Sequence, residues 1–223
     1  MHIPDGVVPI AVAAGGYAVT AGITWYSLRK IDQMDDPRES IPKASLLAAA
    51  FFVASWIHIP IPAPIPVSIH LVLNGLLGAV LGWYAFPAIL IGLLFQAIFF
   101  QHGGLTTLGL NAAIMGIPAL LAFAVFQWRF RVGDIDSKLL TGVFGFLAGA
   151  TGIALGILAF YGIMISTISP DMNVAQEQAA ILTLTLAHIP LMILEGVFTA
   201  LLAIFLMRVK PELLGGLREV RVG

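Results

Sequence analysis

Long apolar segments alternate with short polar segments along most of the chain. An apolar segment of about 20 residues can cross a bilayer as a helix. The pattern predicts such helices over residues 7–28, 42–57, 110–126, 139–168 and 182–207. A chain with this many apolar segments is typical of a helical membrane protein and not of a soluble domain.

Residues 69–100 form one further apolar segment that carries no charge. A single straight helix of that length would measure about 48 Å, against a hydrocarbon core of roughly 30 Å. We expect the chain to break at residues 83–87, because aromatic residues suit an interface and Pro87 suits the first turn of a helix. The break raises the predicted number of transmembrane helices to seven.

The positions of Lys and Arg test this topology, because these residues collect in cytoplasmic segments of membrane proteins. With the N-terminus outside, all 11 basic residues fall on the inner side, in residues 29–43, 127–138 and 208–223. A single crossing over 69–100 would move the later basic residues outside. We therefore predict an all-α membrane protein with seven transmembrane helices, an outer N-terminus and a cytoplasmic C-terminus, forming one polytopic domain over residues 1–223.

Small residues recur at spacings of three and four, which allow close contact between helices. They occur at Ala14, Ala18 and Gly22, at Ala44 and Ala48, and at five glycines from Gly142 to Gly156. Such faces pack either inside the bundle or against another subunit. Residues 58–70, by contrast, contain four prolines, which exclude a helix and predict an extended loop.

Composition agrees with this architecture and excludes several functions. Hydrophobic residues make up 59% of the chain and charged residues 10%. A net charge of −1 gives nucleic-acid binding no electrostatic support. The absence of cysteine excludes thiolate catalysis and thiolate metal sites. No Lys or Arg precedes the first apolar segment, so we expect no cleaved signal peptide and take Met1 as the mature N-terminus.

The first two residues offer the clearest candidate chemistry. A free amine on Met1, the peptide nitrogen of His2 and the His2 imidazole can close on one metal ion as fused five- and six-membered rings. The peptide nitrogen must lose its proton, which favours Ni(II), Cu(II) or Co(II) in a square-planar nitrogen field. Taken alone, His2 is more often an ordinary surface residue, so the interpretation depends on a further ligand.

The predicted topology places all five histidines at or near the outer face, opposite the basic residues. His70 follows the proline loop and begins a helix, so it can point into the mouth of the bundle. It is the candidate for the fourth nitrogen ligand. For His58, His102 and His188, an ordinary interfacial histidine is the better interpretation, with a gating role or a contact behind the ligands as the alternative.

Four other polar residues lie near this predicted site. Glu195 lies inside a predicted span, where an ionisable group is a functional candidate. The alternative is a neutral carboxyl hydrogen-bonded between helices, in which case Glu195→Gln should be nearly silent for binding. Asn74 and Asn111 lie near the outer mouths and could orient ligands or brace loops. Asp5 could accept the second imidazole N–H of His2 or shape a turn.

Several of these segments together resemble the CbiM/NikM family of substrate-binding subunits from energy-coupling-factor importers of cobalt or nickel. They are MHIPDG at the start, SIHLVLNGLLG at 68–78, FQHGGLTTLG at 100–109 with Asn111 behind it, and HIPLMILEG at 188–196. The resemblance implies a seven-helix fold and Ni(II) or Co(II) as the transported substrate. It also implies a metal site on the Met1 amine, the amide and imidazole of His2, and His70.

The resemblance further implies partners and a location. The partners would be a coupling transmembrane subunit, two ABC-type ATPase subunits and a small accessory membrane subunit, in the cell membrane of a prokaryote. The chain contains no Walker A pattern, so we do not expect it to hydrolyse ATP or to be an enzyme. A self-sufficient divalent metal permease is the alternative function. A membrane metalloenzyme would need a motif such as HExxH, which does not occur in the sequence.

Overall fold

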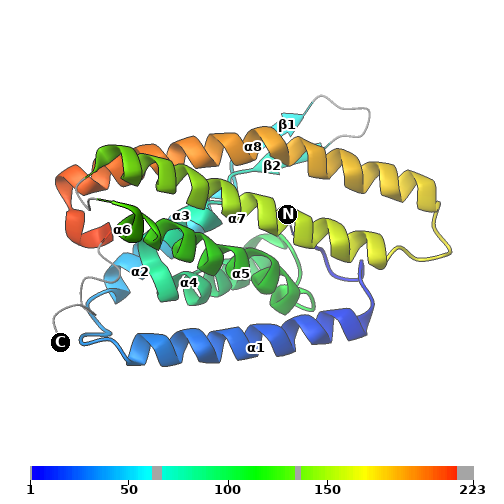
Figure 1. The fold of residues 1–223 in the computed structure, drawn as a ribbon. Coiled ribbons are helices and arrows are strands. Elements are labelled where there is room, and N and C mark those ends of the chain that lie inside the picture. Colours follow the sequence, from blue (N-terminus) through cyan, green and yellow to red (C-terminus); the bar gives the residue numbers. More distant parts are fainter. Residues whose placement is uncertain (1, 62–66, 134–136, 215–223) are drawn as a thin grey trace.

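The computed structural model describes residues 2–61, 67–133 and 137–214, and its long helices lie side by side (Figure 1). The helical elements are α1 (Ile10–Asp32), α2 (Ile41–Ala54), α3 (Asn74–Leu81), η1 (Gly82–Tyr84), α4 (Ala85–Phe100), α5 (Leu108–Gln127), α6 (Arg129–Val132), α7 (Lys138–Ser166), α8 (Val174–Val209) and η2 (Pro211–Leu214). Four helical stretches of the described chain are long and apolar enough to cross a membrane: Asn74–Phe100, Leu108–Val132, Lys138–Ser166 and Val174–Val209. Helix α2 is apolar but shorter. Helix α1 is long enough to cross a membrane, but its hydropathy is lower than that of the four stretches named above.

Helix α5 lies at the centre of the bundle, in contact with α1, α3, α4 and α7. Helix α7 packs along α8, and α2 packs on α4. The contact between α1 and α5 depends on Gly16, because a Cβ atom there would lie 2.6 Å from the backbone of Leu110. The predicted helical membrane architecture is therefore present, with the predicted fifth span at its core.

The break predicted at residues 83–87 is present, and it begins one residue earlier, at η1. Residues along α3 meet successive residues along α5: Asn74 with Met115, Gly78 with Ala119, and Gly82 with Phe123. Helix α3 therefore runs in the direction of α5. Gly82 then adopts a φ of +58°, which suits glycine, and the chain turns back into α4.

The segment before α3 differs from the sequence prediction. Strands β1 (His58–Ile61) and β2 (Val67–His70) pair antiparallel, with His58 opposite His70. The chain is extended there, as the prolines predict, and the hairpin is a short exception within a mostly helical fold. Helix α3 begins at Asn74 and not at residue 69, because β2 occupies the preceding residues and Leu73 has a left-handed φ of 55°.

Helix α8 also begins earlier than predicted, at Val174 and not near residue 182. The side chain of Asn173 caps it by accepting the N–H of Gln176 at 3.2 Å. The first turns contain Ala and Gln, which favour a helix but carry no apolar signal. Hydropathy therefore marks only the apolar part of the helix.

The small-residue faces have different surroundings. On α7, a Cβ at Gly149 would collide with the backbone of Glu195, and one at Gly152 would collide with Gly75. The glycine seam of α7 therefore packs inside the bundle. The face of α1 that carries Ala14 and Ala18 is exposed.

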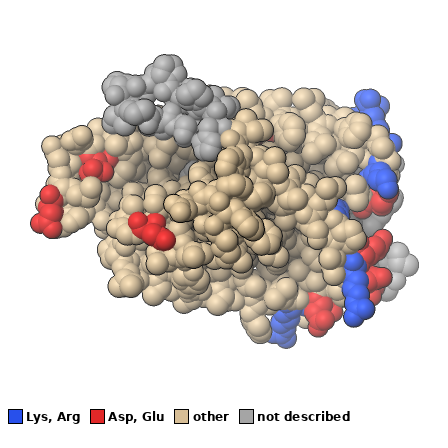
Figure 2. All heavy atoms as spheres, turned by 180° about the vertical axis from the view of Figure 1, so that it is seen from behind, with Lys and Arg blue, Asp and Glu red and all other residues tan. Residues whose placement is uncertain are grey.

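Charge is distributed unevenly over the molecule. On the face drawn in Figure 2, Lys and Arg gather at one end together with several acidic residues. Only acidic residues lie toward the other end, and a broad uncharged region separates the two. This arrangement agrees with the orientation predicted from the basic residues, while the seven crossings and the outer N-terminus stay predictions.

Candidate metal centre

Residues near the N-terminus are held inside the bundle by α5 and by the loop before it. Ile3 is fully buried, and its N–H donates to Oδ1 of Asn111 at 2.9 Å. Its carbonyl accepts hydrogen bonds from Nδ2 of Asn111 at 3.0 Å and from Oγ1 of Thr107 at 2.6 Å. These contacts fix the backbone at residue 3 and therefore the position from which His2 projects.

Asp5 forms a second attachment to the same loop. Its carboxylate accepts the hydroxyl of Thr106 at 2.5 Å and the backbone N–H groups of Leu105, Thr106 and Thr107 at 3.1, 2.9 and 3.3 Å. The Thr106 hydroxyl is the main cause that lowers the pKa of Asp5 below its ordinary value. Gly104 must be glycine, because a Cβ there would collide with the Asp5 carboxylate.

Three imidazoles meet where this N-terminal segment ends. Ring centroids lie 5.0 Å apart for His2 and His70, 4.1 Å for His2 and His102, and 5.2 Å for His70 and His102. One ring nitrogen from each residue lies within 4.8 Å of the others, a separation that one metal ion can span. The structure thus brings His2 and His70 together, and it adds His102, for which the sequence favoured an ordinary interfacial histidine.

Backbone structure explains why these three side chains converge. His70 is the last residue of β2, is 4% exposed, and places Nδ1 3.0 Å from the carbonyl of Leu71. His102 follows Gln101, whose φ of 53° ends α4 and turns the chain toward the N-terminal segment. Each imidazole therefore comes from the end of a different element.

The surroundings of His2 favour its neutral imidazole. Burial is the main cause that lowers the pKa of His2 well below its ordinary value of 6.5, and the neighbouring rings of His70 and His102 are smaller causes in the same direction. A neutral imidazole keeps a lone pair for a metal ion, whereas an imidazolium does not. At neutral pH, His2 can therefore offer a ring lone pair to a cation.

Gln96 belongs to this centre, and sequence reasoning missed it. It is fully buried on α4 and places Oε1 2.8 Å from Nε2 of His2. The only signal in the sequence is one polar residue within the apolar helix Ala85–Phe100. That signal does not reveal a partner 94 positions away.

Asn74 and Glu195 lie behind His70 and brace the start of α3. Nδ2 of Asn74 donates to the carbonyls of Met115 at 3.1 Å and Gly152 at 3.0 Å. Glu195 is 1% exposed, and its two oxygens accept the N–H groups of Val72 and of Leu73, the latter at 2.8 Å. Both residues therefore hold the turn that follows His70.

Two residues predicted for the site have side chains that the structure does not describe, and a third lies elsewhere. Met1 lies outside the described residues, as does the side chain of His58. His188 is buried on α8 and places Nδ1 2.7 Å from Leu184 of its own helix, which gives it a local partner instead of a place in the imidazole cluster.

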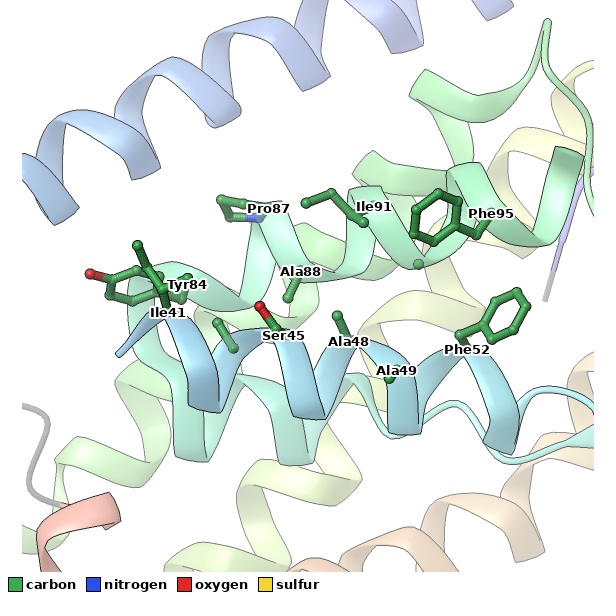
Figure 3. Close-up of a pocket in the computed structure, with 12 residues that line it drawn as sticks. Ile41, Ser45, Ala48, Ala49, Phe52, Tyr84, Pro87, Ala88, Ile91 and Phe95 are labelled. Carbon is green, nitrogen blue, oxygen red and sulfur yellow. The ribbon is translucent and has the colours of Figure 1, made fainter. Parts of the chain in front are cut away.

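A large apolar groove lies elsewhere, between α2 and α4. Its volume is about 410 Å³, and Ala48 and Phe52 of α2 face Ala88 and Ile91 of α4 across it (Figure 3). Its lining offers no imidazole or carboxylate. The groove is therefore not the metal centre.

An apolar helical bundle in which three imidazoles meet around a buried His70 is typical of a membrane protein that handles a transition-metal ion. The sequence profile of the CbiM family, described as "Cobalt uptake substrate-specific transmembrane region", matches residues 2–213. The chain belongs to the CbiM family of metal-transport membrane proteins.

Individual relatives agree with this assignment. A Haemophilus influenzae protein named for metal transport is 36% identical over 217 residues, covering 96% of this chain and 97% of the relative. The "Fused nickel transport protein NikMN" of Rhodobacter capsulatus is 32% identical over 229 residues, covering 96% of this chain and 64% of the relative. The crystal structure of a truncated transition metal transporter matches with a TM-score of 0.75 at 20% identity, covering 94% of this chain and 99% of that one, and so shares the fold.

Proposed function

We propose that this chain captures Ni(II) or Co(II) at its outer face as the substrate-binding subunit of an ATP-driven energy-coupling-factor importer. The observation that carries the proposal is the meeting of His2, His70 and His102, with one ring nitrogen of each within 4.8 Å of the others. The proposed ligands are the Met1 amine, the amide and imidazole of His2, and the imidazole of His70.

This ligand set is chemically suited to the proposed ions. Four nitrogens, one of them a deprotonated amide, form the square-planar field that Ni(II) and Co(II) accept. The attachments of Ile3 and Asp5 support the proposal, because they hold the chelating end of the chain against the loop that carries His102. His102 lies close enough to contact the ion or to close over it.

The relatives support transport of these ions but do not distinguish between them. The family description names cobalt, and the Rhodobacter capsulatus relative is named for nickel. Both ions favour nitrogen ligands in tetragonal sites. The affinity for each must therefore be measured on this chain.

The importer would need partners to drive release on the inner side. We propose a coupling transmembrane subunit, two ABC-type ATPase subunits and a small accessory membrane subunit, in the cell membrane of a prokaryote. The exposed Ala14 and Ala18 on α1 offer a small-residue surface for a partner helix. The glycine seam of α7 does not, since it is occupied within the chain.

The free amine gives the most direct test. A short Gly-Ser extension before Met1 converts the amine into an amide and leaves the His2 side chain intact. We expect the extended protein to purify without bound nickel or cobalt, and a C-terminally tagged protein to retain the ion. Normal metal binding by the extended protein would contradict the proposed ligand set.

A transport assay then tests the importer. We expect proteoliposomes to take up nickel or cobalt only when the coupling subunit and the ATPases are present. Uptake by this chain alone would favour a self-sufficient permease.

A further inference from the structure

Gln96 touches the metal centre but is not among the proposed ligands. Its Oε1 lies 2.8 Å from Nε2 of His2. Its backbone carbonyl accepts the N–H of His102 at 3.2 Å. One buried residue of α4 therefore contacts two of the three histidines, through different atoms.

The contact with His2 fixes where the imidazole carries its proton. An amide oxygen only accepts hydrogen bonds, so Nε2 of His2 must be the donor. A neutral imidazole has one ring proton, so Nδ1 of His2 is bare. Within the described part of the chain, this Nδ1 is buried and has no hydrogen-bond partner. Its lone pair is therefore available to a ligand that the protein itself does not provide.

Nδ1 is also the nitrogen that the chelate needs. The amide nitrogen, Cα, Cβ, Cγ and Nδ1 of His2 close a six-membered ring with a metal ion. Nε2 lies on the far side of the imidazole from Cβ and cannot close that ring. The hydrogen bond from Gln96 thus selects the tautomer that a chelate at His2 requires.

We propose that Gln96 is a positioning residue that holds His2 as the Nε2–H tautomer, so that Nδ1 is ready to bind the transported ion. This inference rests on the function proposed above and adds a residue to it. Histidines that bind metals commonly donate their second ring N–H to an acceptor, and loss of that acceptor typically costs about 10–100-fold in affinity.

Two substitutions separate the acceptor from the shape of the side chain. Gln96→Met keeps the length but removes the oxygen. Gln96→Glu keeps an oxygen that can accept from Nε2 of His2, and the amide nitrogen that it removes has no hydrogen-bond partner among the described residues. Gln127→Met is the matched control, because Gln127 is a buried glutamine at the far end of α5.

The first measurement is the Ni(II) affinity of the full chain with its natural N-terminus and a C-terminal tag. We expect Gln96→Met to lose about 10–100-fold, with an unchanged absorption spectrum at saturating Ni(II) because the ligands are the same. Gln96→Glu and Gln127→Met should remain within a few-fold of the wild type. The proposal would be overturned if Gln96→Met bound Ni(II) with wild-type affinity. It would also be overturned if Gln96→Glu or Gln127→Met lost as much affinity as Gln96→Met.

The second measurement uses metal-free protein and does not depend on transport. Nitrogen-15 NMR of histidine-labelled protein distinguishes a protonated ring nitrogen from a bare one, and His2→Ala identifies the His2 signals. We expect a bare Nδ1 in the wild type and a mixture of tautomers in Gln96→Met. A protonated Nδ1 in the wild type would overturn the role of Gln96. Failure of the wild type to bind Ni(II) would instead overturn the proposed function.

Discussion

Asn111 and Ile3 exchange two hydrogen bonds although 108 positions separate them in the sequence. The side-chain amide of Asn111 pairs with both backbone groups of Ile3, much as a neighbouring strand would. Because His2 directly precedes Ile3, this pair sets the depth at which the His2 imidazole lies. A residue on α5 thereby controls the geometry of a site formed mainly by loops.

Replacing Asn111 should therefore weaken metal binding without removing a ligand. Asn111→Leu keeps the approximate volume but leaves the N–H and the carbonyl of Ile3 without their amide partner. We expect the affinity for Ni(II) or Co(II) to fall by about 10-fold or more, measured by equilibrium dialysis. Asn173→Ala, which removes only the cap of α8, is the control and should bind normally. Equal affinities in the two variants would show that Ile3 holds its position without Asn111.

His70 and His102 of the cluster should differ from His188, which is buried elsewhere. His70→Ala should abolish binding of the ion, because it removes a proposed ligand from a folded bundle. His102→Ala should weaken binding less, as expected for a side chain that adjoins the chelate. His188→Ala should bind as the wild type does, since His188 contacts its own helix. Metal content after purification distinguishes these outcomes, and wild-type content in His70→Ala would exclude it as a ligand.

Glu195 should tolerate substitution less well than the sequence suggests. Both carboxylate oxygens accept backbone N–H groups of the turn after His70, at Val72 and Leu73. Glutamine would turn an N–H donor toward one of them, and an unsatisfied buried group costs about 1–3 kcal/mol. We expect Glu195→Gln to lower the melting temperature and the metal affinity. Glu177→Gln, at a half-buried position in the first turn of α8, should change neither, and a silent Glu195→Gln would show that one acceptor is enough.

Asp5 gives a dependence on pH whose sign follows from its lowered pKa. A carboxyl whose pKa is lower in the folded state stabilises that state above its unfolded pKa, which is ordinarily 3.8. That contribution is lost as the pH falls through the folded pKa. We expect wild type to melt at a higher temperature than Asp5→Ala by a constant difference above pH about 5, with the difference shrinking at lower pH. A difference that grows with acid would contradict the hydrogen bonds described for Asp5.

The orientation can be tested because the chain contains no cysteine. Met172→Cys, in the loop between α7 and α8, should react with an impermeant thiol reagent added outside intact cells. Ser137→Cys, before α7, should react only after the membrane is permeabilised. Labelling of Ser137→Cys from outside would contradict the topology predicted from the basic residues.

The sequence predicted the fold well where hydropathy and charge carry the information. Apolar segments located the long helices, and the excessive length of residues 69–100 indicated the break that Gly82 and η1 provide. Hydropathy failed at the start of α8, because its first turns are helical without being apolar. The pairing of β1 with β2 was also missed, since four nearby prolines argue against strands as well as helices.

The site was predictable only in part. Chelate chemistry at the N-terminus predicted His2 as a metal ligand. The position of His70 after the proline loop predicted that it would lie beside His2, as the structure has it. Gln96 and the place of His102 in the cluster could not be predicted. Both depend on how α4 ends, at Gln101 with its left-handed φ, and on contacts between residues far apart in the sequence.

The attachment of the N-terminal segment has a consequence for how the protein is made. Residues 2–5 leave the ribosome about a hundred residues before their partners at 105–111. At the usual synthesis rate of about 5–20 residues per second, on the order of 5–20 seconds pass between the synthesis of residues 2–5 and that of the loop and helix that bind them. Assembly of the imidazole cluster is therefore a late event in biogenesis, and a nascent chain that stops before α5 cannot complete it.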